Sequence, residues 1–395
     1  MLSDKASIYQ AGIYPGDRLL FGPILANLLA DRRQPPLSKL QAIKDPERFL
    51  WHILPHAART FSLSIVFLPV RMRRALAVAY LYCRMLDTYE DLLPTMAEKE
   101  RALQVFIERF ADGKALQPAP AINPSLTADP RESTHILLVN RAELIDCTFN
   151  KLQPQHQDAI RRLVRRMGEG MIWSSRVFAE QGGALKSPGQ LSRYCWHVLG
   201  TPILFAEEMQ RLDQGLSTEI GAERLRLCAV VGEVIQLANI TRDLEKDYER
   251  GIFYHPDLPG LEGAQREQRI RDVRSQLVLR ALRLAPEFRP FIESLPAPRI
   301  SLARGAGMLL IITTFAYYWR AARKAGLAAF NQHECISRFG GATAWLRCVL
   351  SPKATSRFLR LLEKRFQLAF ERCRPTTSQC FVYDDSQFDV CKVIT

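Results

Sequence analysis

The stretch LCAVVGEVIQLANITRDLEKD (residues 227–247) combines an apolar helical pattern with a row of polar side chains. Its apolar residues recur three and four positions apart, as in Leu227, Val231 and Val234, which is the spacing of one face of an α-helix. The same spacing occurs elsewhere, for example over residues 75–82, and alternating patterns typical of strands are scarce. The sequence therefore predicts an all-α fold.

The polar row in this stretch consists of Gln236, Asn239, Asp243 and Asp247. Spacings of three and four place these side chains on one helix face, about 5–6 Å apart between Cβ atoms. Burying such a row is costly unless a partner satisfies it. Carboxylate and amide oxygens suit hard divalent cations, above all Mg²⁺, which prefers a few carboxylates plus phosphate oxygens of a substrate. The row is therefore a candidate metal site.

A second acidic pair, Asp87 and Asp91, lies in YLYCRMLDTYED (residues 80–91). One such pair on a helix is usually only a solvated face or a set of ion-pair partners, but two pairs on apolar helices favour function. Two rows facing each other would form a cage for Mg²⁺. Zinc is disfavoured, because Cys83 is the only His or Cys at helical ligand spacing to either pair. Glu90 projects toward the edge of the row and stays outside the cage.

Arginines accompany both pairs: Arg84 and Arg242 sit beside them, and Arg59 lies upstream. Each either pairs with a neighbouring acid or anchors a phosphate oxygen. A cage of metal and arginine around a diphosphate stabilises the charge on the departing group. An allylic carbocation left behind requires an apolar cavity lined by aromatic rings. The sequence contains no P-loop, no GxGxxG fingerprint and no pattern typical of a protease triad.

The composition sets further limits on function. Of 395 residues, 54 are Lys or Arg and 41 are Asp or Glu, giving a formal net charge of +13 that favours polyanionic partners. No recognised nucleic-acid motif accompanies this charge, so we expect no nucleic-acid partner. The nine cysteines are odd in number and contain no CxxC pair, which indicates reduced thiols and a cytoplasmic location.

We expect no signal peptide and no membrane-spanning helix. The most apolar run, residues 308–319, is well short of the ~20 residues that a span needs. Residues 19–29 are the one segment that we expect either to contact a membrane surface peripherally or to pack as an arm on the domain. The four prolines in residues 117–134 predict a long surface loop within one domain.

The chain resembles the squalene/phytoene synthase family of head-to-head prenyl synthases. The LDTxED form of its first acidic motif is closer to squalene synthases than to phytoene synthases. The resemblance runs from about residue 52 to 256. Its landmarks are ARTF (58–61), LP (68–69) with RA (74–75), YLYCRMLDTYED (80–91), MGEGM (167–171), YCWHVLG (194–200) and QLANITRDLEKDYERGIFYHP (236–256).

This resemblance implies a single-domain isoprenoid-synthase helical bundle with a central cavity. Residues 51–330 would form the catalytic domain, with an N-terminal arm over 1–50 and a C-terminal extension of unclear structure over 331–395. Two prenyl diphosphates, farnesyl diphosphate being favoured, would be joined through a cyclopropyl intermediate with Mg²⁺ as cofactor. NADPH stays open, because no nicotinamide site can be located. A monomer is compatible with this reading.

The resemblance also assigns roles to individual residues. Tyr80 and Tyr194 would line the cavity and steady cations, although isolated aromatic residues on helices more often belong to the core. For His56, a packed core histidine is an equally good interpretation. The metal would be bound by Asp87, Asp91, Asn239, Asp243 and Asp247, the substrate by His56, Arg59, Arg84, Gln236, Arg242 and Tyr254, and the catalytic residues would be Tyr80, Tyr194 and Arg84.

Three positions depart from the family pattern. Ile252 stands where an arginine follows glycine in the second signature, and Leu199 and Ile203 are bulkier than the usual alanine and glycine. They would narrow the substrate tunnel, and Pro202 would bend its helix. The alternative function is therefore a terpene cyclase that ionises a single allylic diphosphate. A non-catalytic helical scaffold is disfavoured, because a binding protein has no need of two acid pairs.

Overall fold

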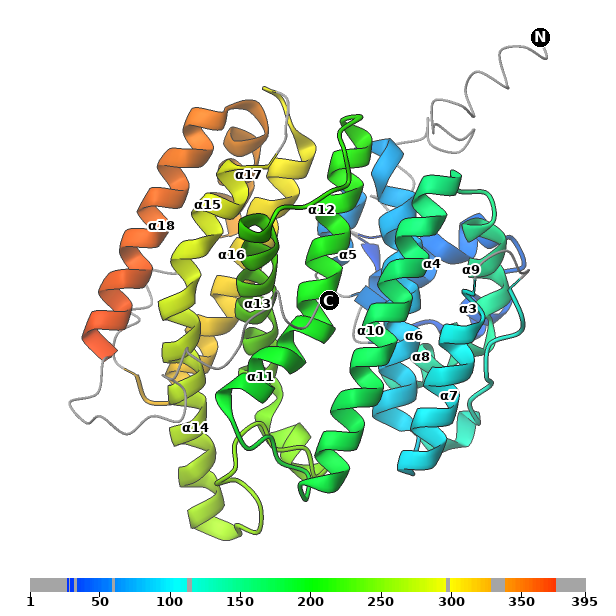
Figure 1. Cartoon of the computed structure of the whole chain (residues 1–395), viewed down its shortest axis with the longest axis horizontal. Coiled ribbons are helices and arrows are strands. Elements are labelled where there is room, and N and C mark those ends of the chain that lie inside the picture. Colours follow the sequence, from blue (N-terminus) through cyan, green and yellow to red (C-terminus); the bar gives the residue numbers. More distant parts are fainter. Residues whose placement is uncertain are drawn as a thin grey trace. The chain divides into compact units, whose positions relative to one another are not determined.

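The structure is a computed structural model, shown in Figure 1. Over the described residues the chain is helical, with no strand beyond one isolated bridge between Ala184 and Phe253. The prediction of an all-α fold is confirmed. The structure describes residues 27, 29–31, 34–58, 61–111, 116–295, 299–327 and 338–373.

The chain divides into two compact units, which are considered one at a time. Unit 1 comprises residues 1–175 and 208–216, and unit 2 comprises residues 176–207 and 217–395. Helices α10 (Pro154–Glu180) and α12 (Thr201–Asp213) belong partly to each. The other helices of unit 1 are α3 (Leu37–Gln41), α4 (Pro46–Ala58), α5 (Phe61–Val66), α6 (Val70–Leu92), α7 (Met96–Glu108), η2 (Pro124–Leu126), α8 (Pro130–Asn140) and α9 (Ala142–Phe149).

Helix α6 is the core helix of unit 1 and packs against α4, α5, α7, α8 and α9. The buried ring of Tyr82 meets Phe110 and Phe149 edge-on, with centroids 5.0 and 5.9 Å away. Its hydroxyl donates to Asp146 Oδ1 at 2.7 Å, and the same carboxylate accepts from Arg109 Nη2 at 2.5 Å. Because a buried hydroxyl without a partner is costly, this contact fixes the rotation of α6 about its axis.

The proline-rich segment over residues 117–134 is shorter and more ordered than predicted. Helix α8 begins at Pro130, because Asp129 caps it by accepting from the backbone N–H of Arg131 at 2.7 Å. Proline is compatible with the first turn of a helix, where no N–H partner exists. The preceding loop is also anchored: Ile122 is buried, and its N–H and C=O both bond to the Asn140 side chain at 2.8 Å. The prediction of a loop extending to residue 134 was wrong in its last five residues.

Unit 2 is built around α13 (Ala222–Glu249), which packs against α11, η3, α14, α15 and α16. Its approach to η3 is very close, since a Cβ at Gly232 would lie 2.5 Å from the Cα of Gly200. A buried ion pair between Arg280 and Glu233, at 2.5 Å, joins α14 to α13. The remaining helices of unit 2 are α11 (Pro188–Cys195), η3 (Trp196–Gly200), α14 (Gly263–Leu284), η4 (Ala285–Glu287), α15 (Phe288–Glu293), α16 (Leu302–Lys324), α17 (Arg338–Leu350) and α18 (Pro352–Cys373).

The helix around Pro202 widens into a π-helical turn. Pro202 has no N–H, so the usual i→i−4 bond at this point is lost. Residues 196–200 adopt π geometry, and the N–H of Thr201 donates five residues back to the carbonyl of Trp196. The Thr201 hydroxyl also donates to the His197 carbonyl at 2.7 Å. The perturbation expected from Pro202 therefore takes the form of a wider turn just before it.

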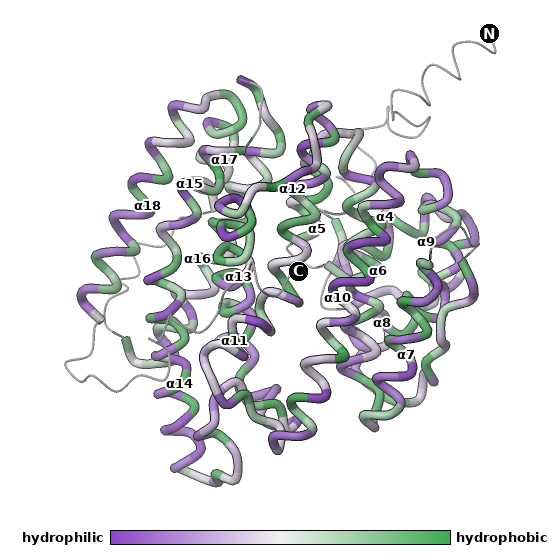
Figure 2. The backbone as a smooth tube through the Cα atoms, in the orientation of Figure 1, coloured by the Kyte–Doolittle hydropathy of each residue, from purple (hydrophilic) through white to green (hydrophobic). Residues whose placement is uncertain are grey.

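Among the described helices, none is both long and apolar enough to cross a membrane. Most of residues 19–29, the segment expected to contact a membrane surface or to pack as an arm, falls outside the described residues. Within it, Asn27 is buried and accepts from the Ser62 hydroxyl at 2.5 Å, whereas Leu29 is exposed. The C-terminal extension contains two described helices, α17 and α18. Figure 2 shows hydrophilic and hydrophobic residues alternating along α18.

Candidate active site

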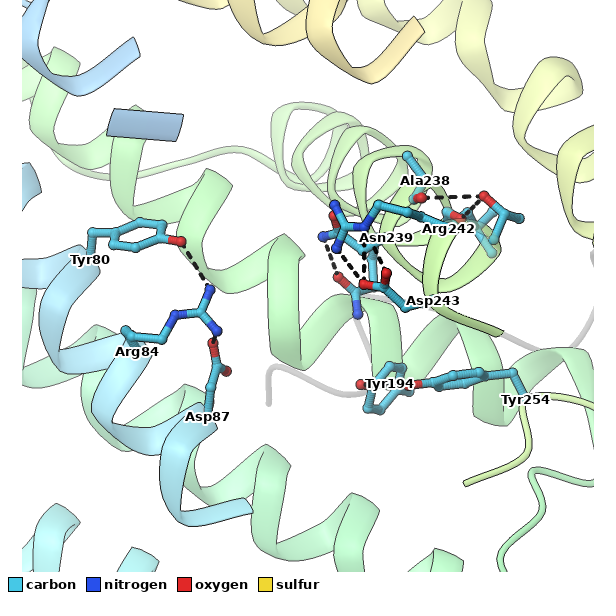
Figure 3. Close-up of polar contacts among 12 residues, drawn as sticks. Tyr80, Arg84, Asp87, Tyr194, Ala238, Asn239, Arg242, Asp243 and Tyr254 are labelled. Atoms are coloured by element: carbon cyan, nitrogen blue, oxygen red, sulfur yellow. Dashed lines mark hydrogen bonds and ion pairs between the residues drawn. The ribbon is translucent and has the colours of Figure 1, made fainter. Parts of the chain in front are cut away.

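The first acidic motif forms a connected row on α6. Arg84 is its centre: Nη1 lies 3.1 Å from Asp87 Oδ2, and Nη2 donates to the Tyr80 hydroxyl at 3.1 Å (Figure 3). The guanidinium carbon is also 5.9 Å from the centroid of the Tyr80 ring, which stacks on Phe61. Spacings of three and four along the helix make these contacts possible. Tyr80, Arg84 and Asp87 therefore act as one hydrogen-bonded group.

The acids of this motif differ in surroundings. Asp91 is exposed, whereas only 23% of the Asp87 side chain is exposed. Burial, with a further contribution from the charge of Asp91, raises the pKa of Asp87 to about 6, although Arg84 opposes this. Burial and the charges of Asp91 and Asp87 raise the pKa of Glu90 to about 8, and its Oε1 accepts from the Ser174 hydroxyl at 3.1 Å. Asp87 is ionised at neutral pH and available to a cation, whereas Glu90 is largely protonated.

The second acidic motif lies on α13 in unit 2. Arg242 binds both carboxylate oxygens of its sequence neighbour Asp243 through two guanidinium nitrogens. Nε lies 2.9 Å from Oδ1, and Nη2 lies 2.5 Å from Oδ2 (Figure 3). Asn239 Nδ2 donates to Gln236 Oε1 at 3.2 Å, so the amides form a second pair one turn earlier. The Asp243 side chain is 38% exposed and Asp247 is partly exposed. The row predicted from sequence is thus present, with its carboxylates open to solvent.

Arg242 is held from a second helix. The ring of Tyr317 on α16 lies beneath its guanidinium, 5.1 Å from centroid to carbon. Burial lowers the pKa of Arg242, but hydrogen bonding to Asp243 and the charge of that carboxylate outweigh burial, so its pKa is raised. Arginine prefers to stack flat on aromatic faces, which leaves its N–H groups free to bind oxygens in the plane. Tyr317 therefore orients the donors of Arg242.

Three aromatic rings form a buried cluster in unit 2. The hydroxyls of Tyr194, on α11, and Tyr254, after α13, are 3.3 Å apart, and their ring centroids are 5.4 Å apart. Phe178, near the end of α10, packs edge-on against both, at 6.0 and 6.1 Å. All three side chains are less than a tenth exposed. Because ring faces carry negative potential, the cluster is of the kind that can stabilise a cation in an apolar setting.

A short backbone bridge positions Tyr254. The N–H of Phe253 donates to the Gly183 carbonyl at 2.8 Å, and the N–H of Leu185 donates to the Phe253 carbonyl at 2.9 Å. Gly183 has φ of +86°, and a Cβ there would lie 2.2 Å from the Gly251 carbonyl oxygen. No other residue type fits this position. Gly183, which follows α10, therefore determines where Tyr254 is placed.

The end of α13 accounts for the aliphatic residue at position 252. Gly251, with φ of +73°, donates to the Tyr248 carbonyl at 3.0 Å, and Ile252 donates to the Asp247 carbonyl at 2.9 Å. These are the two bonds of a Schellman motif, in which the residue after the glycine usually makes an apolar contact with the last turn. Arg250, the residue before this glycine, occupies the C-cap.

The remaining candidate residues lie as follows. His56 is buried on α4, which packs against α6, and Arg59 lies outside the described residues. Ile203 is buried and Leu199 half-buried, and their predicted effect on a tunnel stays a prediction. In the part of the chain that the structure describes, no group of three or more His, Cys, Asp or Glu side chains is arranged to hold a metal ion.

Sequence reasoning missed Phe178, Tyr317 and Ser174. Tyr317 lies within the apolar run over residues 308–319, which looks like ordinary core, and its partner Arg242 is far away in the sequence. Phe178 follows the MGEGM landmark on the same helix, and helical spacing alone does not indicate its aromatic partners. Contacts between helices that are remote in sequence leave no periodic signal.

A family model described as squalene/phytoene synthase matches residues 54–333. Among similar proteins, squalene synthase BSS of Botryococcus braunii is 27% identical over 226 residues, covering 57% of this chain and 45% of that protein. Lycopaoctaene synthase of the same organism is 30% identical over 229 residues, covering 57% and 46%. The squalene synthase of Yarrowia lipolytica is 25% identical over 219 residues, covering 53% and 45%. The chain thus spans a little under half the length of these relatives.

Two solved structures share the fold. The structure of TcSQS with the ligand BPH1237 aligns with a TM-score of 0.64 and 19% identity, covering 85% of this chain and 94% of that one. The structure of TcSQS with E5700 aligns with a TM-score of 0.60 and 19% identity, covering 83% and 97%. At this level of identity the likeness establishes the fold of the chain.

Proposed function

The chain belongs to the squalene/phytoene synthase family, and from this premise we propose that it joins two prenyl diphosphates head to head, with farnesyl diphosphate as the favoured substrate. One observation carries this proposal: the same pairing of an arginine with the first aspartate of a motif occurs on α6 and on α13. Arg84 pairs with Asp87, and Arg242 pairs with Asp243. Joining two diphosphate esters calls for two sets of such groups.

The donors on each helix fit Mg²⁺ bound together with substrate. Asp87 and Asp91 on α6, and Asn239, Asp243 and Asp247 on α13, supply oxygens only, and Mg²⁺ prefers one or two carboxylates plus phosphate oxygens and water. Too few acids gather on either helix to hold a bare ion firmly, which suits a metal that arrives with the diphosphate. When bound, Mg²⁺ would neutralise charge on the departing diphosphate.

The arginines have a separate task in this proposal. In the structure each guanidinium is engaged by an aspartate of its own helix. Once the carboxylates are taken up by a cation, the N–H donors of Arg84 and Arg242 are available to phosphate oxygens. Tyr80 and Tyr317 hold these guanidinium groups in place meanwhile. Preorganised donors of this kind stabilise the charge that develops as the diphosphate leaves.

The aromatic cluster is proposed to protect the cation. Tyr194, Tyr254 and Phe178 present ring faces and edges in a buried setting, where water is excluded and cation–π attraction is strongest. Loss of diphosphate leaves an electron-deficient allylic carbon, which the double bond of the second prenyl chain attacks with loss of a proton. Tyr80 and Tyr194 keep the roles that the family resemblance gives them, and His56, Arg59 and Gln236 stay proposed substrate contacts.

Product analysis tests the proposal. Purified protein is incubated with Mg²⁺ and the C10, C15 or C20 diphosphate, with and without NADPH, and products are identified by mass spectrometry. A C30 product from the C15 substrate supports condensation, and its dependence on NADPH decides whether reduction follows. Absence of both a C30 and a C40 product would overturn the proposal. A C15 hydrocarbon or alcohol alone would favour the terpene cyclase, the alternative raised by Leu199, Ile203 and Ile252.

A further inference from the structure

Four large apolar side chains are exposed together at one end of unit 2. One precedes α16 and one begins it, and the other two lie one turn apart at the end of α17. The two segments are adjacent, because the N–H of Ser301 donates to the Val349 carbonyl at 3.0 Å. Figure 1 shows α17 and the first turn of α18 at this same end. The exposed residues, here called the apolar tip, are Ile300 (63% exposed), Leu302 (37%), Leu346 (50%) and Leu350 (50%).

The apolar tip is held rigidly by a buried arginine. Arg304 is only 5% exposed, and its Nε donates to the Cys348 carbonyl at 2.8 Å. Its Nη2 donates to the carbonyls of Arg299 at 2.6 Å and Val349 at 3.2 Å. One guanidinium thus joins the segment before α16 to the end of α17. These bonds keep the two segments, and the apolar side chains that they expose, next to each other, and an exposed apolar patch of this kind indicates a partner.

The sequence around the apolar tip is rich in basic residues and poor in acids. Between Glu293 and Glu363 the sequence contains ten Lys or Arg residues and one acid, Glu334. Arg299, Arg347 and Lys353 are exposed directly beside the tip in the sequence. This charge opposes pairing with a second copy of the same surface, because like charges would meet. It complements an anionic surface instead.

We propose that the apolar tip and its basic rim dock unit 2 on an anionic lipid bilayer. The four apolar side chains enter the interfacial region, and Arg299, Arg347 and Lys353 contact lipid phosphates. Apolar side chains ringed by Lys and Arg are the pattern of proteins that lie on a membrane without crossing it. The proposal does not depend on the enzymatic function, since it rests on exposure, rigidity and charge alone.

Vesicle co-sedimentation of the full-length protein tests this inference. Vesicles of phosphatidylcholine alone are compared with vesicles of equal parts phosphatidylcholine and phosphatidylserine. The wild type should bind the anionic vesicles and release them at about 0.5 M salt. The double variant Leu346→Ser/Leu350→Ser should bind roughly tenfold more weakly. The double variant Arg347→Glu/Lys353→Glu should bind anionic vesicles at least about tenfold more weakly than the wild type does. Its binding to vesicles of phosphatidylcholine alone should be unchanged.

Matched controls come from exposed residues of unit 1. Val105→Ser/Leu126→Ser removes two apolar side chains of 41% and 42% exposure, and Arg131→Glu reverses one exposed charge. Both should bind like the wild type. No binding of the wild type to anionic vesicles would overturn the inference, as would equal binding by the tip variants and these controls. A dimer in light scattering that Leu346→Ser/Leu350→Ser converts to monomer would also overturn it, because a second copy would then occupy the tip.

Discussion

Arg242 binds both carboxylate oxygens of its sequence neighbour Asp243, at 2.9 and 2.5 Å, so the arginine and the aspartate of this motif satisfy each other in the structure. Arg84 also pairs with an aspartate of its own helix, Asp87, through one contact of 3.1 Å. An acid that is already paired with arginine needs no further partner for stability. Under the proposed function, a cation bound with the substrate would take the arginine's place on each carboxylate.

Asp87→Ala and Asp243→Ala should each lower turnover by at least about a thousandfold. The reason is that no bound cation would neutralise the charge on the departing diphosphate. The fold should be retained, since both side chains reach solvent. Steady-state rates and circular dichroism measure the two effects. Asp158→Ala is the matched control, because Asp158 pairs with Arg161 at 2.8 Å on α10 but lies outside both motifs. Wild-type rates in folded Asp243→Ala would refute the metal assignment.

Tyr317→Leu should raise the KM for the prenyl diphosphate by about three- to tenfold, since a cation–π contact is worth about 0.5–1.5 kcal/mol at a half-buried site. Tyr317→Phe keeps the ring under Arg242 and should stay closer to the wild type. The comparison of KM with kcat in the two variants separates orientation of the guanidinium from loss of packing. Equal effects of Leu and Phe would assign the role to the hydroxyl instead.

Gly183→Ala should destabilise the protein by about 3 kcal/mol or more, because its positive φ disfavours a side chain and the new Cβ would meet the Gly251 carbonyl. Gly182→Ala is the matched control: it also has positive φ, +67°, but nothing lies within 4 Å of the added Cβ, so the cost should be about 1 kcal/mol. Thermal unfolding measures both. Similar melting temperatures for the two variants would show that the bridge to Phe253 is not tightly constrained.

Acidification should destabilise the protein through His255. Burial, assisted by the charge of Arg269, lowers the pKa of this histidine to about 4, and its Nδ1 accepts from the Asp257 N–H at 3.2 Å. The unfolded chain, with a histidine pKa of about 6.5, binds the proton more tightly, so stability falls as pH drops from about 6.5 toward 4.

His255→Asn keeps an acceptor for the Asp257 N–H but cannot be protonated. Between about pH 7 and pH 5 it should lose about 2 kcal/mol less stability than the wild type. Melting temperatures at both pH values provide the measurement. If the wild type and the variant lose the same stability over this range, another group is responsible for the acid sensitivity.

The sequence could predict what depends on local periodicity. The apolar pattern over residues 227–247 predicts α13, and the spacing of Gln236, Asn239 and Asp243 predicts their common face. The proline-rich segment was harder, because Pro130 looks like a helix breaker although Asp129 makes it a helix start. That the two acid rows face each other, and the roles of individual site residues, stay predictions.

What depends on contacts between remote helices could not be predicted. The placement of Tyr317 under Arg242 joins α16 to α13, and that of Phe178 against Tyr194 joins α10 to α11. The apolar tip arises in the same way, since the segments that carry Ile300 and Leu350 are joined by hydrogen bonds of Ser301 and Arg304. Each depends on tertiary packing, which leaves no trace in the local pattern.

The central claim is that two prenyl diphosphates are joined into one product. A crossover experiment tests it most directly: the protein is given an equal mixture of unlabelled and fully deuterated farnesyl diphosphate with Mg²⁺, and the products are analysed by mass spectrometry. Condensation predicts a C30 product in which the half-labelled species is the most abundant. Products of C15 size that are either wholly labelled or wholly unlabelled, with no half-labelled species, would contradict the claim.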